Sequence, residues 1–140
     1  MGIIATNDNE IKLYYCGDNA LGKQTYAYVS ASAKKVLGID VCKTKVTGSQ
    51  WAEIATGLNI PVSELINTDH PDFISAYGEE NLDLDAHDWL RVLEKHPETL
   101  AYPIMILGAV FRVLKSPSEF VKYMEPDSMD KDVRQNSTNV

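Results

Sequence analysis

The stretch from Asp88 to Ile104 reads DWLRVLEKHPETLAYPI and decides the fold of the chain. Its first half has apolar residues at helical spacing, namely Trp89, Leu90 and Leu93. Asp85 is a good N-cap just before them, and Pro97 stops the helix. Pro103 then leads into the apolar residues 104–107, which predict a strand.

The residues that follow this stretch predict a hairpin and a final helix. A second short strand is expected from Val110 to Leu114, after a two-residue turn at Gly108-Ala109. The string SPSE at 116–119 matches a capping box with proline at the first helical position. It predicts a helix that runs to about Met124.

The N-terminal third predicts a parallel strand pair joined by a helix. Glu10 to Cys16 alternates as a strand does, and Val36 to Lys43 alternates in the same way. Between them, about Ala20 to Lys35 has apolar residues at helical spacing. A strand, a helix and a strand in so short a span form a βαβ unit, so the two strands are expected to be parallel.

The middle of the chain predicts helices rather than strands. Thr47-Gly48-Ser49-Gln50 matches a capping box and precedes a helical apolar stripe. Pro61 restarts the chain into a short turn of helix. His70 to Asp83 is polar and predicts a loop, with one helical turn around Phe73 to Tyr77. The whole pattern is α/β.

Three of these strings resemble the arsenate reductase (ArsC)/Spx family of thioredoxin-like proteins. Residues 88–104 resemble the family's "HPELLxRPI" segment, Trp51 to Asn67 its "WLELLxxLG" stretch, and Ser116 to Val121 its "RPPExV" helix start. The resemblance implies a thioredoxin-like βαβ…ββα fold, a four-stranded mixed sheet with a helical insert. The segment after Pro126 is polar and has no apolar stripe to bury, so the chain is expected to divide into an N-terminal arm at 1–9, the domain at 10–125 and a disordered tail at 126–140.

The resemblance also assigns the family's active-site positions, and most of its reactive groups are replaced here. Asn19 occupies the position of the family's cysteine, and an asparagine amide is a good helix N-cap but not a nucleophile. The three arginines that would hold an oxyanion correspond to Asn67, Tyr102 and Ser116. The other assigned positions are Gly17, Gly22, Lys23 and Pro103, and Lys115 lies beside Ser116. The family's cis-proline implies a cis Tyr102-Pro103 bond.

Cys16 is the one candidate for a catalytic thiol, because it ends the first strand three positions before Asn19. A cysteine on a sheet face is more often a small buried apolar residue. Cys16 and Cys42 end neighbouring strands and are expected to be reduced thiols. A disulfide between them requires Cα atoms within about 7 Å.

Composition limits the partners. The chain has 140 residues, 44% of them hydrophobic, which suits one domain with one core. A net charge of −7 disfavours direct contact with nucleic acid or an anionic membrane. No apolar stretch approaches the roughly 20 residues of a membrane span, so the cytoplasm is expected.

His70, His87 and His96 do not have the spacing of metal ligands, and neither a metal nor a cofactor is predicted.

Two functions remain open. The first is a binding or regulatory module that acts through a protein partner and lacks arsenate reductase chemistry. It is consistent with a tyrosine-rich cleft, formed by Tyr14, Tyr15, Tyr26, Tyr28 and Tyr102. The alternative is an enzyme, a glutathione- or glutaredoxin-linked thiol oxidoreductase that uses Cys16.

Two expectations concern the core. One face of the sheet is expected to be buried by the apolar strand residues Ile11, Leu13, Ile39, Val41, Ile104 and Ile106. Trp51 and Trp89 are expected to pack within the helical insert or at its junction.

Overall fold

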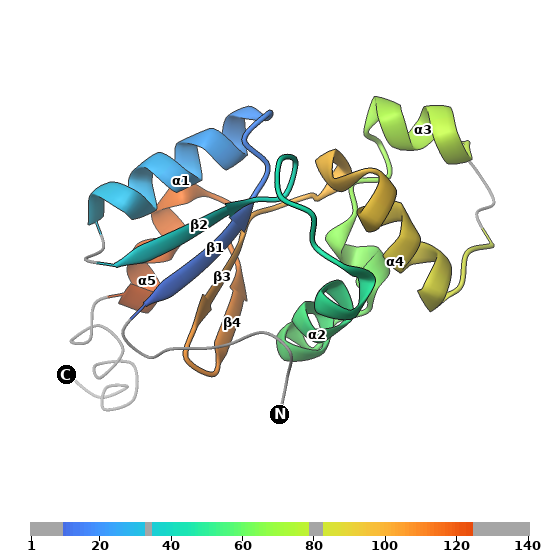
Figure 1. The fold of residues 1–140 in the computed structure, drawn as a ribbon. Coiled ribbons are helices and arrows are strands. Elements are labelled where there is room, and N and C mark those ends of the chain that lie inside the picture. The colour runs from blue at the N-terminus through green and yellow to red at the C-terminus, as the bar shows by residue number, and fades with distance from the viewer. Residues whose placement is uncertain (1–9, 33–34, 79–82, 125–140) are drawn as a thin grey trace.

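The computed structural model describes residues 10–32, 35–78 and 83–124, which form a four-stranded sheet with helices on both faces (Figure 1). The strands are β1 (Ile11–Tyr15), β2 (Val36–Asp40), β3 (Ile104–Leu107) and β4 (Val110–Val113). Their order is β2-β1-β3-β4, with β1 parallel to β2 and antiparallel to β3. The predicted α/β fold with a mixed sheet is confirmed. The predicted arm at 1–9 and tail at 126–140 lie outside the described residues.

The helices divide between the two faces of the sheet. On one face lie α1 (Ala20–Ser32), the 3₁₀ turn η3 (Pro117–Phe120) and α5 (Val121–Met124). On the other lie α2 (Gly48–Leu58) and α4 (Ala86–Lys95), with α3 (Pro71–Tyr77) beyond α4 (Figure 1). A short 3₁₀ turn, η1 (Val62–Leu65), lies between α2 and α3, and another, η2 (Pro97–Thr99), lies between α4 and β3. None of the described helices is long and apolar enough to cross a membrane.

Two helices of the insert begin as their sequences predict. Thr47 caps α2 through the backbone N–H of Gln50, and the Gln50 side chain accepts a hydrogen bond from the N–H of Thr47. Asp85 and Asp88 form the equivalent reciprocal pair at the start of α4. Such caps satisfy backbone donors that a helix leaves without partners.

Three local predictions differ from the structure. The strand predicted to reach Lys43 ends at Asp40, because the chain turns there and the carbonyl of Asp40 accepts hydrogen bonds from the N–H groups of Lys43 and Thr44. The helical turn predicted around Phe73 to Tyr77 is present but longer, since the seven-residue helix α3 begins at Pro71 and is capped by the His70 ring. Ser116 makes no side-chain cap; Glu119 instead accepts a hydrogen bond from the N–H of Lys115 at 2.9 Å.

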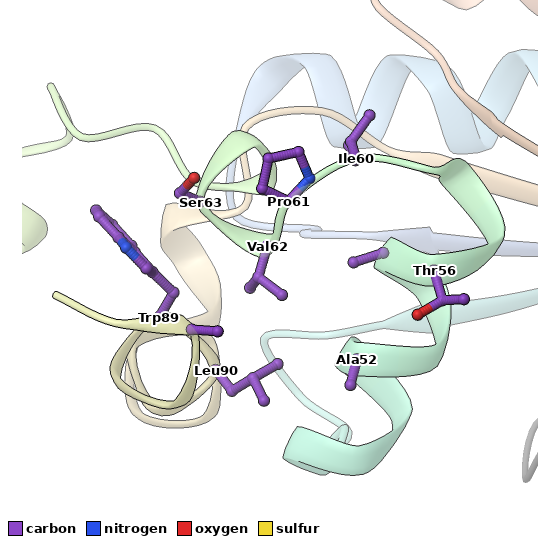
Figure 2. A pocket seen from close by; sticks show the side chains of 10 residues that line it. Ala52, Thr56, Ile60, Pro61, Val62, Ser63, Trp89 and Leu90 are labelled. Atoms are coloured by element: carbon purple, nitrogen blue, oxygen red, sulfur yellow. The ribbon is translucent and has the colours of Figure 1, made fainter.

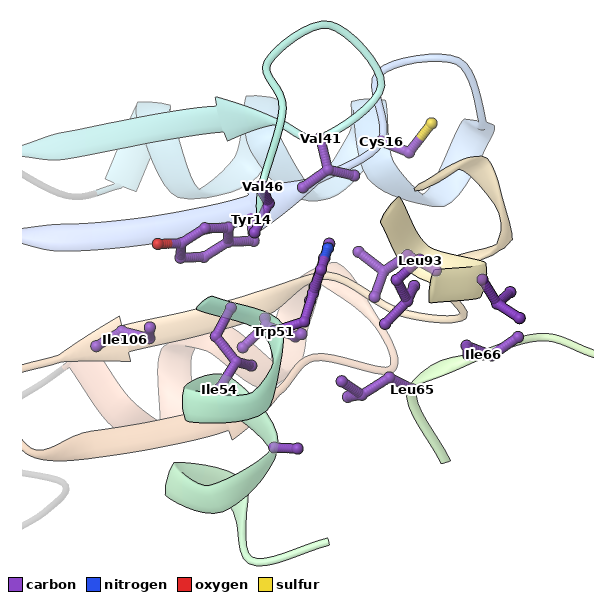
Figure 3. Packing of buried hydrophobic residues seen from close by; sticks show 14 of the residues in the cluster. Tyr14, Cys16, Val41, Val46, Trp51, Ile54, Leu65, Ile66, Leu93 and Ile106 are labelled. Atoms are coloured by element: carbon purple, nitrogen blue, oxygen red, sulfur yellow. The ribbon is translucent and has the colours of Figure 1, made fainter. Parts of the chain in front are cut away.

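The core has two parts, one on each face of the sheet, which corrects the prediction of one shared face. Ile11 and Leu13 pack with Val29 of α1 and with Phe120. Ile39, Val41, Ile104 and Ile106 belong instead to the cluster around Trp51 (Figure 3). The reason is the register between β1 and β3: Leu13 lies opposite Met105, so these two residues share one face and Ile104 lies on the other.

Both tryptophans pack in the insert, as predicted. Trp51 is fully buried, with its ring centroid 6.4 Å from that of Tyr14 (Figure 3). Its indole N–H has no hydrogen-bond partner among the described residues. Trp89 is half-buried and stacks on Phe73 at 5.8 Å, and its indole N–H donates to the carbonyl of Leu84.

Tyr14 links this core to the stability of the protein at alkaline pH. Burial raises the pKa of its phenol above the usual 10.0, and the charge of Glu53 adds to that shift. A raised pKa in the folded state contributes stability below the unfolded pKa, and this contribution is lost as pH rises through the folded pKa. We therefore expect Tyr14→Phe to reduce the fall in stability above about pH 10, measured by urea unfolding at several pH values.

The matched control is Tyr102→Phe, which removes an exposed phenol. Part of the alkaline loss is expected to remain in Tyr14→Phe, because burial and then Asp40 also raise the pKa of Tyr15. Equal alkaline losses in the wild type and in Tyr14→Phe would contradict this role of Tyr14.

Candidate functional site

The topology brings four chain segments to one edge of the sheet. The parallel strands β1 and β2 end there, at Tyr15 and Asp40, which lie opposite each other. Because β3 is antiparallel to β1, it begins at the same edge, with Ile104 opposite Tyr14. Strand β4 ends there too, since Val113 lies opposite Ile104. Most of the predicted active-site positions follow or precede these strand ends.

At this edge, Asn19 acts as the cap of α1. Its side-chain oxygen accepts a hydrogen bond from the backbone N–H of Gly22 at 2.6 Å. Its own carbonyl accepts a hydrogen bond from the N–H of Lys23, whose side chain is exposed. Asn19, which the sequence resemblance assigns to the position of the family's cysteine, is thus a capping amide and supplies no nucleophile.

Gly22 is required by close packing of the helix against the end of β1. A Cβ atom at this position would lie 2.0 Å from the carbonyl oxygen of Cys16, a contact that real structures do not tolerate. Because the neighbour is backbone, relief requires α1 or the end of β1 to move. Gly22 thus fixes the distance between the cap and the strand end.

We expect Gly22→Ala to destabilise the protein by about 2 kcal/mol or more, although alanine is the better helix former. Gly48→Ala is the control, because its Cβ would meet only the end of the Glu94 side chain, at 3.0 Å. Chemical unfolding of both variants measures the difference. Equal stability of the two variants would contradict the close approach at Gly22.

Cys16 and Cys42 form a disulfide, with Cα atoms 5.3 Å apart. The expectation of two reduced thiols is therefore wrong for this structure, and the distance condition for a disulfide is met. The physical reason is the parallel register, which continues beyond the strands: the N–H of Val41 donates to the carbonyl of Tyr15 at 2.8 Å. Cys16 is 2% exposed and Cys42 is half-buried, so Cys42 is the more accessible sulfur.

Asp40 holds the two cysteine-bearing segments together independently of the disulfide. One oxygen of its carboxylate accepts hydrogen bonds from the N–H groups of Gly17 and Cys42, each at 3.0 Å. Sequence reasoning missed this role. The available signal was an aspartate close to the end of a strand that was expected to pair in parallel with β1.

The three positions that the sequence resemblance assigns to the family's arginines hold no cationic side chain. The side chain of Asn67 accepts a hydrogen bond from the N–H of Asp69, and that of Ser116 lies 3.3 Å from the hydroxyl of Ser118. Tyr102 is exposed, and the ammonium group of Lys115 lies 5.8 Å from its ring centroid. Lys115 therefore places one charge here, without the planar fork of an arginine.

Pro103 is buried, but its bond to Tyr102 is trans, as are all peptide bonds of the described residues. The predicted cis bond is wrong. Trans is the favoured isomer of X-Pro bonds by about 0.5–1 kcal/mol. The carbonyl of Pro103 accepts a hydrogen bond from the N–H of Leu114 at 2.9 Å, so the pairing of β3 with β4 continues through this residue.

The tyrosines do not line one cleft. Tyr14 lies in the core on the α2 face, whereas Tyr28 packs edge-on against Phe120 on the opposite face. Tyr15 and Tyr26 form a separate stacked pair, with centroids 4.7 Å apart. The prediction of a tyrosine-rich cleft is therefore wrong.

The insert instead contains shallow pockets. One, of about 380 Å³, lies between α2 and α4, and its lining includes Ala52 and Thr56 of α2, Trp89 and Leu90 of α4, and Val62 between them (Figure 2). Another, of about 230 Å³, opens beside the disulfide and is lined by residues 41–46 together with Leu93, Glu94 and Pro97. This second pocket includes Cys42 and the lysines Lys43 and Lys45.

The sheet order β2-β1-β3-β4, with a βαβ unit, a terminal ββα unit and a helical insert between them, is that of the thioredoxin-like fold. No family model matches the sequence, and no curated protein is similar to it in sequence. Among solved structures, the chain is similar to an arsenate reductase from Vibrio cholerae. The TM-score is 0.70 at 14% identity, over 83% of this chain and 98% of that one.

The chain is also similar to an arsenate reductase (ArsC) related protein from Brucella melitensis. That match has a TM-score of 0.57 and 12% identity, over 86% of this chain and 99% of the other. The fold is thus the ArsC-like form of the thioredoxin fold, as the sequence motifs indicate.

Proposed function

We propose that the chain is a cytoplasmic binding or regulatory module that acts through a protein partner and has no arsenate reductase chemistry. The observation that carries the proposal is the hydrogen bond by which the Asn19 side chain caps α1. The sequence resemblance assigns this position to the family's catalytic cysteine. A fold alone does not define activity, since the site decides it.

The other groups at the edge support the same proposal. Both cysteines are joined in a disulfide, so the described residues contain no free thiol. The positions for three guanidinium groups hold an amide, a phenol and a hydroxyl: Asn67, Tyr102 and Ser116. Each charge-assisted hydrogen bond that an arginine would make to an oxyanion is worth roughly 1.5–3 kcal/mol. The nucleophile and the cations would act in the same step, the attack of a thiolate on the bound oxyanion, so both losses affect that step.

The test is an arsenate reductase assay with glutathione and glutaredoxin supplied, in which we expect no turnover. Asn19→Cys is the matched variant, since it restores a thiol at the start of α1 without the cations. It is expected to react quickly with an alkylating reagent and still to reduce no arsenate. Turnover by the wild type that disappears on Cys16→Ser would contradict the proposal.

The binding role has its own measurement. Chemical cross-linking in cells, followed by mass spectrometry, is expected to recover one partner at fixed sites on this chain. Recovery is expected to persist in a Cys16→Ser, Cys42→Ser double variant. Dependence of recovery on either cysteine would favour the second candidate instead.

The second candidate is a thiol oxidoreductase, and the disulfide at the end of β1 favours it. The reactive unit would then be the Cys16–Cys42 pair rather than Cys16 alone. A glutathione thiolate attacks the half-buried sulfur of Cys42, and Cys16 leaves as a thiolate. A second glutathione thiolate then releases glutathione disulfide and leaves Cys42 reduced, while the protein takes up two protons.

This candidate predicts where a mixed disulfide forms. In Cys16→Ser, glutathione disulfide is expected to modify Cys42, beside the pocket that Lys43 and Lys45 line. The rate at which glutathione disulfide modifies Cys42 is compared with its rate of reaction with a small unstructured thiol whose charge is similar to that of the segment around Cys42. A rate no faster than the small thiol would leave the disulfide without an enzymatic role.

A further inference from the structure

Cys16, Asp18 and Cys42 bring three metal-ligand atoms together at the end of the sheet. Each sulfur and one carboxylate oxygen lie within 4.8 Å of one another. We propose that, once the disulfide is reduced, these three residues bind a zinc-type divalent cation in a tetrahedral site. This site goes beyond the proposed function and does not depend on it.

The donor set has the chemistry that Zn²⁺ prefers. Cysteine thiolates and carboxylates are standard zinc ligands, and three protein ligands leave a fourth position for water. Hard cations such as Mg²⁺ and Ca²⁺ prefer oxygen ligands, so two thiolates select against them. The site is also accessible: Asp18 is exposed and Cys42 half-buried, whereas Cys16 lies behind them at 2% exposure.

Contacts other than the S–S bond also hold the two cysteine-bearing segments together. The Asp40 carboxylate bonds to the backbone of Gly17 and of Cys42, and so holds the two segments side by side. The N–H of Val41 donates to the carbonyl of Tyr15 just before the cysteines. The two thiols of the reduced protein are therefore held as neighbours, and little ordering is required when the metal binds.

Metal binding and the disulfide exclude each other. A dithiol reductant transfers two electrons and two protons to the S–S bond, which yields two thiols and the oxidised reductant. Zinc then replaces the two thiol protons, forms two Zn–S bonds and one Zn–O bond, and releases the protons to solvent. Affinity is therefore expected to fall as pH is lowered, and the oxidised chain offers no thiolate.

The experiment titrates Zn²⁺ into reduced full-length protein, under argon, in competition with a chromophoric chelator. One zinc ion per chain is expected for the reduced protein and none for the oxidised protein. Co²⁺ serves as a spectroscopic probe, because a tetrahedral site with two thiolates shows thiolate-to-cobalt charge transfer and strong d–d bands. Equal zinc uptake by both redox states, or one ion per two chains, would overturn the proposal.

Asp18→Asn tests the third ligand without removing a cysteine. We expect it to weaken zinc binding by about tenfold or more. Asp83→Asn, which removes one negative charge from an exposed residue just before α4, is expected to leave affinity unchanged. Circular dichroism checks that both variants are folded. Equal affinities of the two variants would reject the three-residue site, and thiolate-to-cobalt bands that survive Cys42→Ser unchanged would reject the pair.

Discussion

Replacing Trp51 with alanine is expected to lower the free energy of unfolding by about 3–5 kcal/mol. Trp51 is fully buried in the larger hydrophobic cluster, between the sheet and the helices of the insert (Figure 3). Loss of the indole ring leaves a cavity lined by residues of the sheet and of the insert. Closing this cavity would require both the sheet and the insert helices to move. Urea unfolding followed by circular dichroism measures the effect.

Trp51→Phe is the control for this prediction. The indole N–H has no partner among the described residues, so phenylalanine removes ring volume without breaking a hydrogen bond. We expect a clearly smaller loss of stability than with alanine. Equal losses in the two variants would contradict the assignment of the effect to the size of the cavity.

Reduction of the Cys16–Cys42 disulfide is expected to lower the free energy of unfolding by about 3 kcal/mol. The bond closes a loop with a sequence separation of 26, and cross-links of this span typically contribute that much by restricting the unfolded chain. The measurement is urea unfolding with and without a dithiol reductant.

The control is the Cys16→Ser, Cys42→Ser double variant, whose stability is expected to match that of the reduced protein. Its stability should not respond to the reductant. A reductant effect below about 1 kcal/mol on the wild type would mean that this bond does not restrict the unfolded state as the loop model requires.

The sequence was most informative where structure depends on neighbouring residues. The capping box at Thr47 and the N-cap at Asp85 formed as predicted, because each needs only residues three positions apart. The hairpin at Gly108 formed as well, with a positive φ of 59° that glycine accommodates. The three strings that resemble the family predicted how these elements are arranged, and the structure has the ArsC-like fold that they imply.

Predictions that depended on register between distant segments failed. Alternation within β1 and within β3 shows which residues share a face of each strand, but not which faces coincide. The pairing of Leu13 with Met105 rather than with Ile104 decides that, and it joins residues far apart in sequence. The tyrosine cleft failed for a local reason: Tyr14 and Tyr15 are neighbours in β1 and therefore lie on opposite faces of the sheet.

The site was predicted in part. The capping role of Asn19 followed from local chemistry, and the structure contains that hydrogen bond. For the disulfide, the sequence indicated only the requirement that the two Cα atoms lie close enough. The positions of two cysteines in a sequence do not show how far apart they lie in the folded chain. Asp40 was missed because its partners, Gly17 and Cys42, lie on two different segments.

The position of β1 in the middle of the sheet has a consequence for folding kinetics. β1 and β2 are joined by one helix, and β3 and β4 by a two-residue turn, so each of these pairs connects successive strands of the chain. The pairing of Ile11 with Leu107 must bring together the two ends of the domain. Such non-local contacts slow folding. During synthesis on the ribosome, the edge of β1 that pairs with β3 therefore stays unpaired until the hairpin of β3 and β4 has emerged.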